Sequence, residues 1–301
     1  METSELLRSI TTLPVISSGG VRQLAEEMLA GNFRSIFKGQ GMEFDEARHY
    51  QIGDDIRSID WNASARFGTP FVKMFREERD LTVFLLIDIS PSMHRGNISR
   101  KGLSPYEQAL LSSALISFST EHTGQQTGAF FFDKEIEKVF PPRKGRHHIM
   151  ALIMAALQYQ DTKKERKSRN GSNLAEALTG AQRLLKKRSL VVILSDFFSM
   201  NWETELTNLC RKHDCIALRI CDPPDMPFSG LITLIDPETG VKIEAPAGMN
   251  SFQKSWAEWQ ADRSASWEAQ CKRAGSSFLE LSTAADAPST LFKFFGSRKK
   301  Q

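Results

Sequence analysis

The sequence predicts an α/β fold built on a doubly wound, mostly parallel sheet. Three mainly apolar runs, at residues 82–87, 189–194 and 216–220, are typical of strands that are buried on both faces. Helical segments separate these runs, and such alternation of strands with helices favours a parallel sheet covered by helices. The composition agrees, because 41% hydrophobic and 25% charged residues in a chain of 301 are typical of a globular protein.

The remaining elements are expected from periodicity and from helix and strand breakers. Residues 20–30 place Val21, Leu24, Met28 and Leu29 on one face, which predicts an amphipathic N-terminal helix. Residues 32–80 mix charged and aromatic side chains with glycines, which favours short strands and loops. Further helices are expected at 105–122, where Pro105 suits a first turn, and at 146–160, 174–187, 202–213, 250–274 and 288–295. Further strands are expected at 127–132, 136–140 and 277–281.

Breaks in this pattern divide the chain. Pro141 and Pro142 are expected to end the strand at 136–140. Residues 231–235 and 241–244 bracket the turn sequence PETG, which predicts a hairpin inserted on the sheet. The expected organisation is an N-terminal region at 1–80, an α/β domain at 81–296 with the insertion near 223–248, and a basic tail at 297–301.

Charge and hydropathy exclude several classes of protein. The 39 basic and 36 acidic side chains give a formal charge of only +3, so no nucleic-acid partner is expected. The first residues lack the basic region and the apolar core of a signal peptide. No window approaches the roughly 18 apolar residues of a membrane span. With four cysteines and no export signal, we expect a cytoplasmic protein.

Polar residues follow two of the buried strands and precede one helix. Asp88, Ser90 and Ser92 come directly after the first strand, Asp196 follows the second, and Ser172 stands at the start of a helix. The carboxyl ends of parallel strands meet at one edge of the sheet, where ligand sites form. Carboxylate and hydroxyl oxygens without sulfur or imidazole suit a hard divalent cation, Mg²⁺ or Mn²⁺. The alternative is that these side chains only cap helices or pair locally, with Ser172 as a helix cap.

These three segments resemble the metal-ion-dependent adhesion site of von Willebrand factor A-type domains. The resemblance lies in Asp88-x-Ser90-x-Ser92, Gly-Ser172-Asn-Leu and Leu-Ser-Asp196. It implies that these five side chains surround a divalent cation, and that residues 81–296 form a domain of this type. Two departures are Ser172 in place of the usual threonine and Phe197 in place of a frequent glycine, which could narrow the mouth of the site.

The segment upstream carries a second resemblance. Its residues include Gly39–x–Gly41, Arg48-x-Tyr50, the run GDDIRSIDW at 53–61, Ala65-Arg66 and EERD at 77–80. They resemble the bacterial "domain of unknown function 58" family, over about 32–281. That resemblance implies a partner of a MoxR-type AAA+ ATPase.

Three interpretations of the charged segment remain open. Its acidic and basic residues favour ion pairs and bidentate bonds, which could form a structural clasp onto the sheet. They could instead form a docking surface for a partner, or a catalytic carboxylate pair, although no histidine accompanies them. The candidate residues are Asp54, Asp55, Arg57, Asp60, Trp61 and Arg66.

Other motifs carry weaker signals. Cys210, His213, Cys215 and Cys221 lack the paired knuckle of a zinc site, so packing is the preferred interpretation. The tryptophans 256, 259 and 267 lie on one expected helix and suit either core packing or a partner groove. The basic run at 163–169 suits a solvated linker or a guide for an acidic partner.

The expected function is therefore interaction rather than catalysis. Nucleotide-binding, nucleophile-elbow and zinc-protease motifs are missing from the sequence. We expect a metal-dependent adaptor or chaperone-like partner of the ATPase, with a client protein supplying an Asp or Glu to the ion. The alternatives are a metal-dependent phosphoester hydrolase and a purely structural domain with an empty site.

Overall fold

A computed structural model describes residues 42–77, 82–94, 103–161, 172–222, 230–235 and 241–298. The helix expected at 20–30, the basic run at 163–169 and the PETG turn fall outside these described residues, as does the end of the basic tail.

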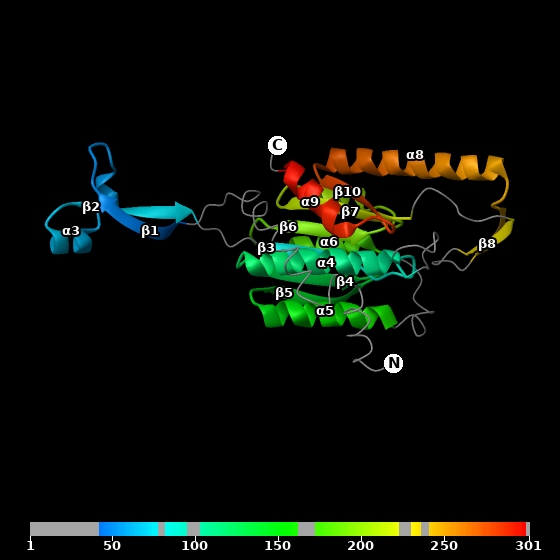
Figure 1. Cartoon of the computed structure of the whole chain (residues 1–301), viewed down its shortest axis with the longest axis horizontal. Helices are drawn as coiled ribbons and strands as arrows, with labels where there is room; N and C mark the ends of the chain where they lie inside the picture. Colours follow the sequence, from blue (N-terminus) through cyan, green and yellow to red (C-terminus); the bar gives the residue numbers. More distant parts are fainter. Residues whose placement is uncertain are drawn as a thin grey trace.

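A six-stranded sheet in the order β10-β7-β6-β3-β4-β5 forms the centre of the molecule (Figure 1). All its strand pairs are parallel except β4 with β5, which are antiparallel. The strands are β3 (Thr82–Asp88), β4 (Gln126–Phe132), β5 (Ile136–Arg143), β6 (Leu190–Ser195), β7 (Asp214–Cys221) and β10 (Ser277–Ser282). The expected α/β class with a mostly parallel sheet is thus confirmed.

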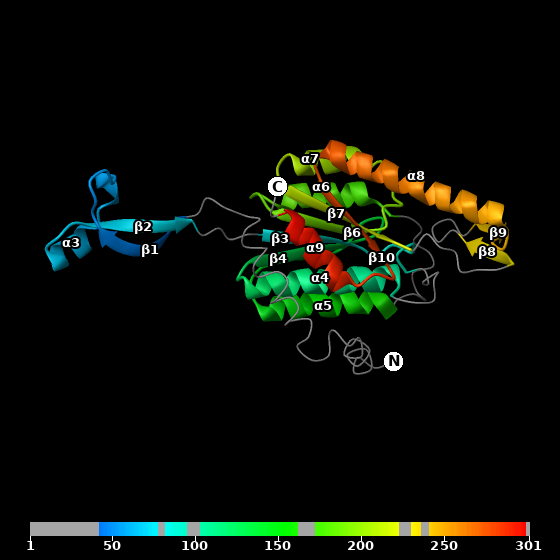
Figure 2. The same cartoon turned by 45° about the horizontal axis from the view of Figure 1, so that its top comes forward.

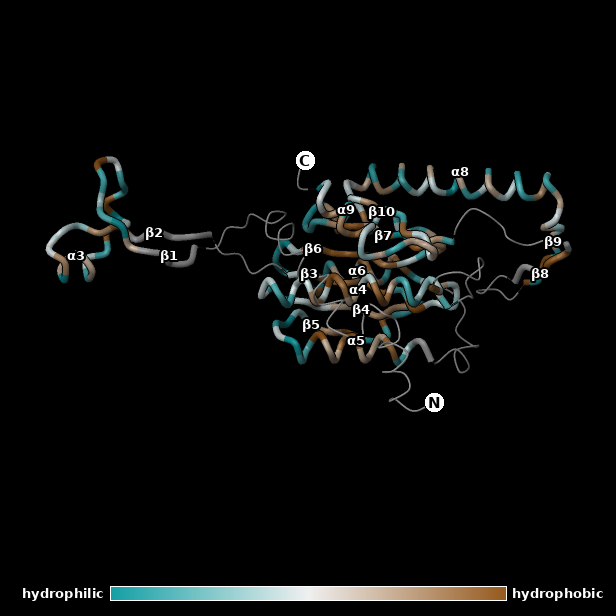
Figure 3. Tube along the Cα trace, viewed as in Figure 1, coloured by the Kyte–Doolittle hydropathy of each residue, from teal (hydrophilic) through white to brown (hydrophobic). Residues whose placement is uncertain are grey.

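Helices cover both faces of this sheet, as Figures 1 and 2 show. On β3, Val83, Leu85 and Ile87 belong to one core and Phe84 and Leu86 to the other, because side chains alternate along a strand. The first core is completed by α4 (Pro105–His122), α5 (Arg146–Asp161) and α9 (Ala287–Arg298). The second is completed by α6 (Leu174–Leu184), α7 (Glu203–Cys210) and α8 (Asn250–Ala274). Hydrophobic segments accordingly concentrate between sheet and helices (Figure 3). Within the described part of the chain, no helix is long and apolar enough to cross a membrane.

Several boundaries differ from the expected ones. Strand β5 continues through Pro141 and Pro142, because it lies at the edge of the sheet, where a missing N–H costs no ladder bond. Helix α6 ends at Leu184, three residues early. The expected hairpin exists as β8 (Leu231–Ile235) and β9 (Lys242–Pro246), but it forms a two-stranded sheet of its own and does not join the central one.

The N-terminal unit consists of β1 (Met42–His49), the 3-10 turn η1 (Ile56–Ser58), α3 (Trp61–Phe67) and β2 (Phe71–Glu77). Strands β1 and β2 lie in the region where short strands were expected, and they pair antiparallel. Helix α3 was not expected; it begins after Asp60, whose carboxylate accepts hydrogen bonds from the N–H groups of Asn62 and Ala63. In Figures 1 and 2 this unit stands apart from the central sheet.

Candidate metal centre

The first loop of the site leaves the carboxyl end of β3. Asp88 is the last residue of that strand and is completely buried, as are Ser90 and Ser92 in the turn that follows. The backbone N–H of Ser90 donates to Asp88 Oδ1 at 2.9 Å, and the hydroxyl oxygens of Ser90 and Ser92 lie 3.0 Å apart. The three side chains therefore gather at one point, as the Asp-x-Ser-x-Ser spacing predicts.

The second loop brings Ser172 to the same point. Its hydroxyl donates to Asp88 Oδ2 at 3.2 Å. The cap of α6 is Asn173, whose side chain accepts from the N–H of Glu176, so the alternative in which Ser172 caps the helix is wrong. Ser199 ties this loop to the third one, because its hydroxyl donates to the carbonyl of Ser172 at 2.8 Å.

The third loop leaves the carboxyl end of β6, the strand beside β3. Asp196 follows the last residue of β6, is buried, and accepts a hydrogen bond on Oδ1 from the N–H of Phe198. Ser195, which the sequence analysis did not select, donates its hydroxyl to Asp88 Oδ2 at 2.6 Å. The signal for Ser195 was its place directly before Asp196 at a strand end.

Phe197 does not narrow the mouth of the site. Its backbone adopts a left-handed conformation with φ 54°, and its side chain is buried against the rings of Trp202 and Trp267. The ring exposed at this loop is instead Phe198, which is 38% exposed. The core therefore accommodates the phenylalanine side chain that stands where a glycine is frequent.

The electrostatics of the site are dominated by two buried carboxylates. Desolvation by burial and, second, the negative charge of Asp196 together raise the pKa of Asp88 to about 7, against the hydrogen bonds from Ser195 and Ser90, which lower it. Such mutual repulsion between buried carboxylates is relieved by a proton or by a cation. This cluster therefore has the charge that a divalent cation would neutralise.

The donor set fits a hard cation. Two carboxylates and the hydroxyls of Ser90, Ser92 and Ser172 offer oxygen atoms only, which is the chemistry that Mg²⁺ and Mn²⁺ prefer. Among the described residues, no group of three or more His, Cys, Asp and Glu side chains is placed to hold a metal ion. A site here must consequently rely on its serine hydroxyls.

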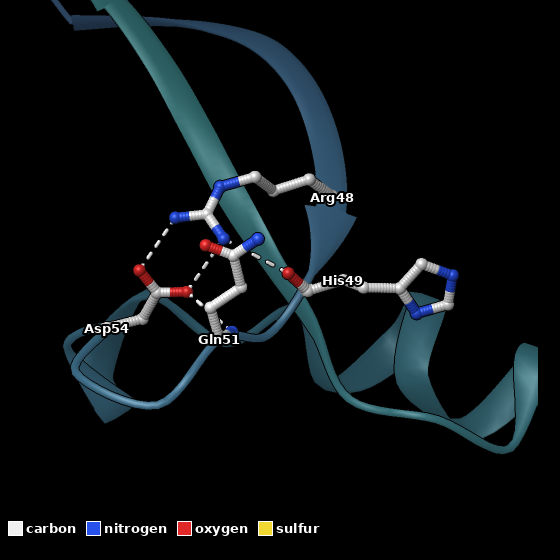
Figure 4. Close-up of polar contacts among 4 residues, drawn as sticks. All are labelled: Arg48, His49, Gln51 and Asp54. Carbon is white, nitrogen blue, oxygen red and sulfur yellow. Dashed lines mark hydrogen bonds and ion pairs between the residues drawn. The ribbon is translucent and has the colours of Figure 1, made fainter.

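Several contacts of the charged segment lie within the described part of the N-terminal unit. The Arg48 guanidinium donates two hydrogen bonds, of 2.6 and 2.8 Å, to the Asp54 carboxylate (Figure 4). Asp54 also accepts a hydrogen bond from the N–H of Gln51. Hydrogen bonding to Arg48 lowers the pKa of Asp54 and raises that of Arg48. Arg48 also donates to the carbonyl of His49. The ion pair fixes the turn between β1 and η1.

The other candidates of this segment divide into caps and exposed side chains. Asp55 caps η1 by accepting from the N–H of Arg57, and Asp60 caps α3. These hydrogen bonds lie within the N-terminal unit, and the clasp onto the sheet stays a prediction. Trp61 is 69% exposed, and Arg57 and Arg66 are also exposed. Because Arg57, Trp61 and Arg66 are exposed, they are available to a partner, and the docking interpretation stays a prediction.

The cysteines and tryptophans lie elsewhere. All four cysteines are free thiols, with Cys215 and Cys271 buried, and burial raises the pKa of Cys271 to about 12. Trp267 is packed in the core, as one interpretation expected, whereas Trp259 is 47% exposed. Core packing is therefore confirmed for Trp267, and a partner groove at Trp256 and Trp259 stays a prediction.

Comparison with known proteins identifies relatives of unknown activity. The chain is 28% identical over 286 residues to the uncharacterized protein Rv1480 of Mycobacterium tuberculosis, covering 93% of this chain and 87% of that one. It is 29% identical over 166 residues to the uncharacterized protein MAV169 of Mycobacterium avium, covering 53% of this chain and 94% of that one.

Solved structures are similar at lower identity. The conserved hypothetical protein BatB from Bacteroides thetaiotaomicron aligns with a TM-score of 0.46 and 15% identity, over 73% of this chain and 100% of that chain. The SpRpn10 VWA domain aligns with a TM-score of 0.38 and 12% identity, over 71% of this chain and 94% of that chain.

A family model matches most of the chain. Its description is "Protein of unknown function DUF58", and the match runs over residues 46–266. The matched region includes both the charged segment and the three loops around Asp88. The chain belongs to the DUF58 family.

Proposed function

We propose that this protein is a metal-dependent protein-interaction module. The observation that carries the proposal is the meeting of Asp88 and Asp196, both buried, with the hydroxyls of Ser90, Ser92 and Ser172 at the carboxyl edge of the sheet. The negative charge of Asp196 helps to raise the pKa of Asp88, and a cation between the two carboxylates would relieve this repulsion. Mg²⁺ is the preferred ion and Mn²⁺ the second choice.

The residues of the chain would hold the ion and leave room for a partner. Asp88 and Asp196 neutralise at most two positive charges, and the serines contribute neutral oxygens. A bound Mg²⁺ would offer an open coordination position to a carboxylate oxygen from another protein. Ser195 and the backbone N–H of Ser90 hold Asp88 in one orientation. The partner would therefore supply an Asp or Glu.

The partners are proposed from the family resemblance. A MoxR-type AAA+ ATPase is the proposed motor, and the protein would act as an adaptor or chaperone-like factor in the assembly of a client complex. The exposed residues of the N-terminal unit, Arg57, Trp61 and Arg66, are the proposed surface for this second partner. We propose a cytoplasmic location for the assembly.

The test is co-purification of the tagged chain with the ATPase and the client from the source cell, in Mg²⁺ and in chelator. Client capture should vanish in chelator and return with Mg²⁺ or Mn²⁺. Asp196→Ala and Ser172→Ala should lose the client and stay folded, since both lie on loops. Glu244→Ala, an exposed carboxylate on β9, is the matched control. Capture that survives both chelator and Asp196→Ala would refute the proposal.

A further inference from the structure

A row of aromatic side chains lies on the N-terminal half of α8. Phe252, Trp256 and Trp259 are spaced four and three residues apart, so they share one face of the helix. Phe198, in the third loop of the candidate metal centre, adds a fourth ring. We call these four residues the aromatic strip. Trp259 is 47% exposed and Phe198 is 38% exposed, while the other two rings are half-buried.

The strip is continuous from helix to loop. The rings of Phe252 and Trp256 stack at 6.4 Å, and those of Trp256 and Trp259 lie 5.2 Å apart. The guanidinium of Arg263, one turn further along α8, sits 5.7 Å from the Trp259 ring and 3.3 Å from the Phe198 ring. Arg263 therefore bridges the two parts by cation–π contacts.

The N-terminal half of α8 contributes no buried residue to the protein core. The buried residues of α8 are Trp267, Cys271 and Ala274, all in its C-terminal half. Figures 1 and 2 show the N-terminal half reaching beyond the central sheet toward β8. Large aromatic side chains gathered on an exposed face mark interaction sites in soluble proteins.

Arg263 also connects the strip to the candidate metal centre. Its Nη2 donates to the carbonyl of Asp196 at 3.2 Å and to that of Phe197 at 3.3 Å. The same guanidinium thus contacts the loop that carries Asp196 and the rings that begin the strip. A chain segment whose carboxylate reached the metal edge would lie beside Phe198 and Trp259.

We propose that the aromatic strip is a second contact surface for the partner whose carboxylate is captured at the metal edge. Its occupant is a peptide segment that carries an Asp or Glu with an aromatic or large aliphatic side chain a few residues away. This inference rests on the proposed function. Tryptophan and arginine are the residue types that most often anchor protein interfaces, and the strip provides them at the border of the acidic-ligand site.

The probe is an array of acetylated hexapeptides that carry one Asp, with Trp, Phe, Leu, Ala or Ser at each of the other positions. Binding is measured by fluorescence anisotropy of labelled peptides in Mg²⁺. Peptides with an aromatic or leucine neighbour should bind about tenfold more tightly than their alanine counterparts. Trp259→Ala should abolish this preference and leave calorimetric Mg²⁺ affinity unchanged. Phe292→Ala, which removes an exposed aromatic ring from α9, is the matched control and should change neither quantity.

The outcomes separate the inference from the proposed function. If Mg²⁺ does not bind the wild-type chain, the proposed function fails. If Mg²⁺ binds but Asp peptides bind without regard to their neighbours, or not at all, the inference is overturned while the metal site stands. Aromatic peptides that bind equally well without Asp would also overturn it. Self-association of the chain that is lost in Trp259→Ala would replace the proposed occupant with a second copy.

Discussion

At the scale of single residues, Asp88 is the group that makes the site sensitive to protons. It is buried beside Asp196, and its pKa is raised to about 7, whereas an unfolded aspartate titrates near 3.8. Between pH 3.8 and about 7, Asp88 therefore keeps its proton in the folded, metal-free chain but has lost it in the unfolded chain. The stability of the metal-free chain falls as pH rises through this window, by up to about 1.4 kcal/mol per pH unit.

This linkage predicts the pH dependence of metal binding. A cation must displace the proton on Asp88, so Mg²⁺ affinity should rise by up to about tenfold per pH unit below pH 7 and level off above it. Calorimetric titrations across this range measure the slope. Asp88→Asn should remove most of the binding and, without metal, should flatten the fall of melting temperature with pH. A wild-type affinity that is flat from pH 5 to 8 would contradict the assignment.

Ser195 gives a second prediction at this scale. Its 2.6 Å hydrogen bond favours the ionised form of Asp88, so Ser195→Ala should raise the pKa of Asp88 and weaken Mg²⁺ binding at pH 7 by several-fold, on the order of 1 kcal/mol. Ser189→Ala, a buried serine before the other end of the same strand, is the matched control. Equal losses in both variants would indicate a general packing effect.

At the scale of elements, local signals decided which boundaries could be predicted. Helix α4 has the expected bounds, because Ser104 and Glu107 form a capping box and Pro105 occupies the first turn. The prediction that Pro141 and Pro142 end β5 was wrong, because an edge strand tolerates proline and the position of a strand in the sheet cannot be predicted from its own residues. Helix α3 was missed because it is seven residues long and none of them is buried. Ser195 was missed because its role depends on a neighbouring strand.

Two glycines give a prediction about how elements pack. A Cβ on Gly128 of β4 would lie 2.8 Å from the backbone oxygen of Phe140 on β5, which cannot move without breaking strand pairing. Gly128→Ala should therefore cost about 1–3 kcal/mol.

Gly180→Ala on α6 is the comparison. Its new methyl would meet chiefly the end of the Ile136 side chain, which can rotate, and alanine also favours the helix by roughly 1 kcal/mol. Urea denaturation should therefore show a clearly larger loss for Gly128→Ala. A reversed order would mean that β4 and β5 are not held as tightly as their pairing suggests.

At the scale of the whole molecule, the N-terminal unit and the central sheet differ in how they are stabilised. The sheet has an apolar core on each face. The unit shows capping bonds and an ion pair, and although Val72 is buried, four of its large apolar residues are exposed: Ile52, Ile56, Trp61 and Phe67. Such a unit depends on local polar bonds and on any partner that covers its apolar side chains.

Asp60→Ala tests this difference. Loss of the α3 cap should cost about 1 kcal/mol within the unit and leave the sheet unaffected. Hydrogen exchange should therefore accelerate in α3, β1 and β2, while β3 and β6 keep their protection. Exchange that accelerates equally in β3 and β6 would show that the charged segment clasps the sheet after all.

The most direct test of the account is the position of a bound ion in a crystal. Crystals grown with Mn²⁺ should show one strong anomalous peak at the carboxyl edge of the sheet, within about 2.0–2.3 Å of oxygens from Asp88, Ser90, Ser92, Ser172 or Asp196, some through water. The Asp88→Ala crystal should lack that peak. A wild-type crystal in saturating Mn²⁺ with no peak at this edge would contradict the central claim.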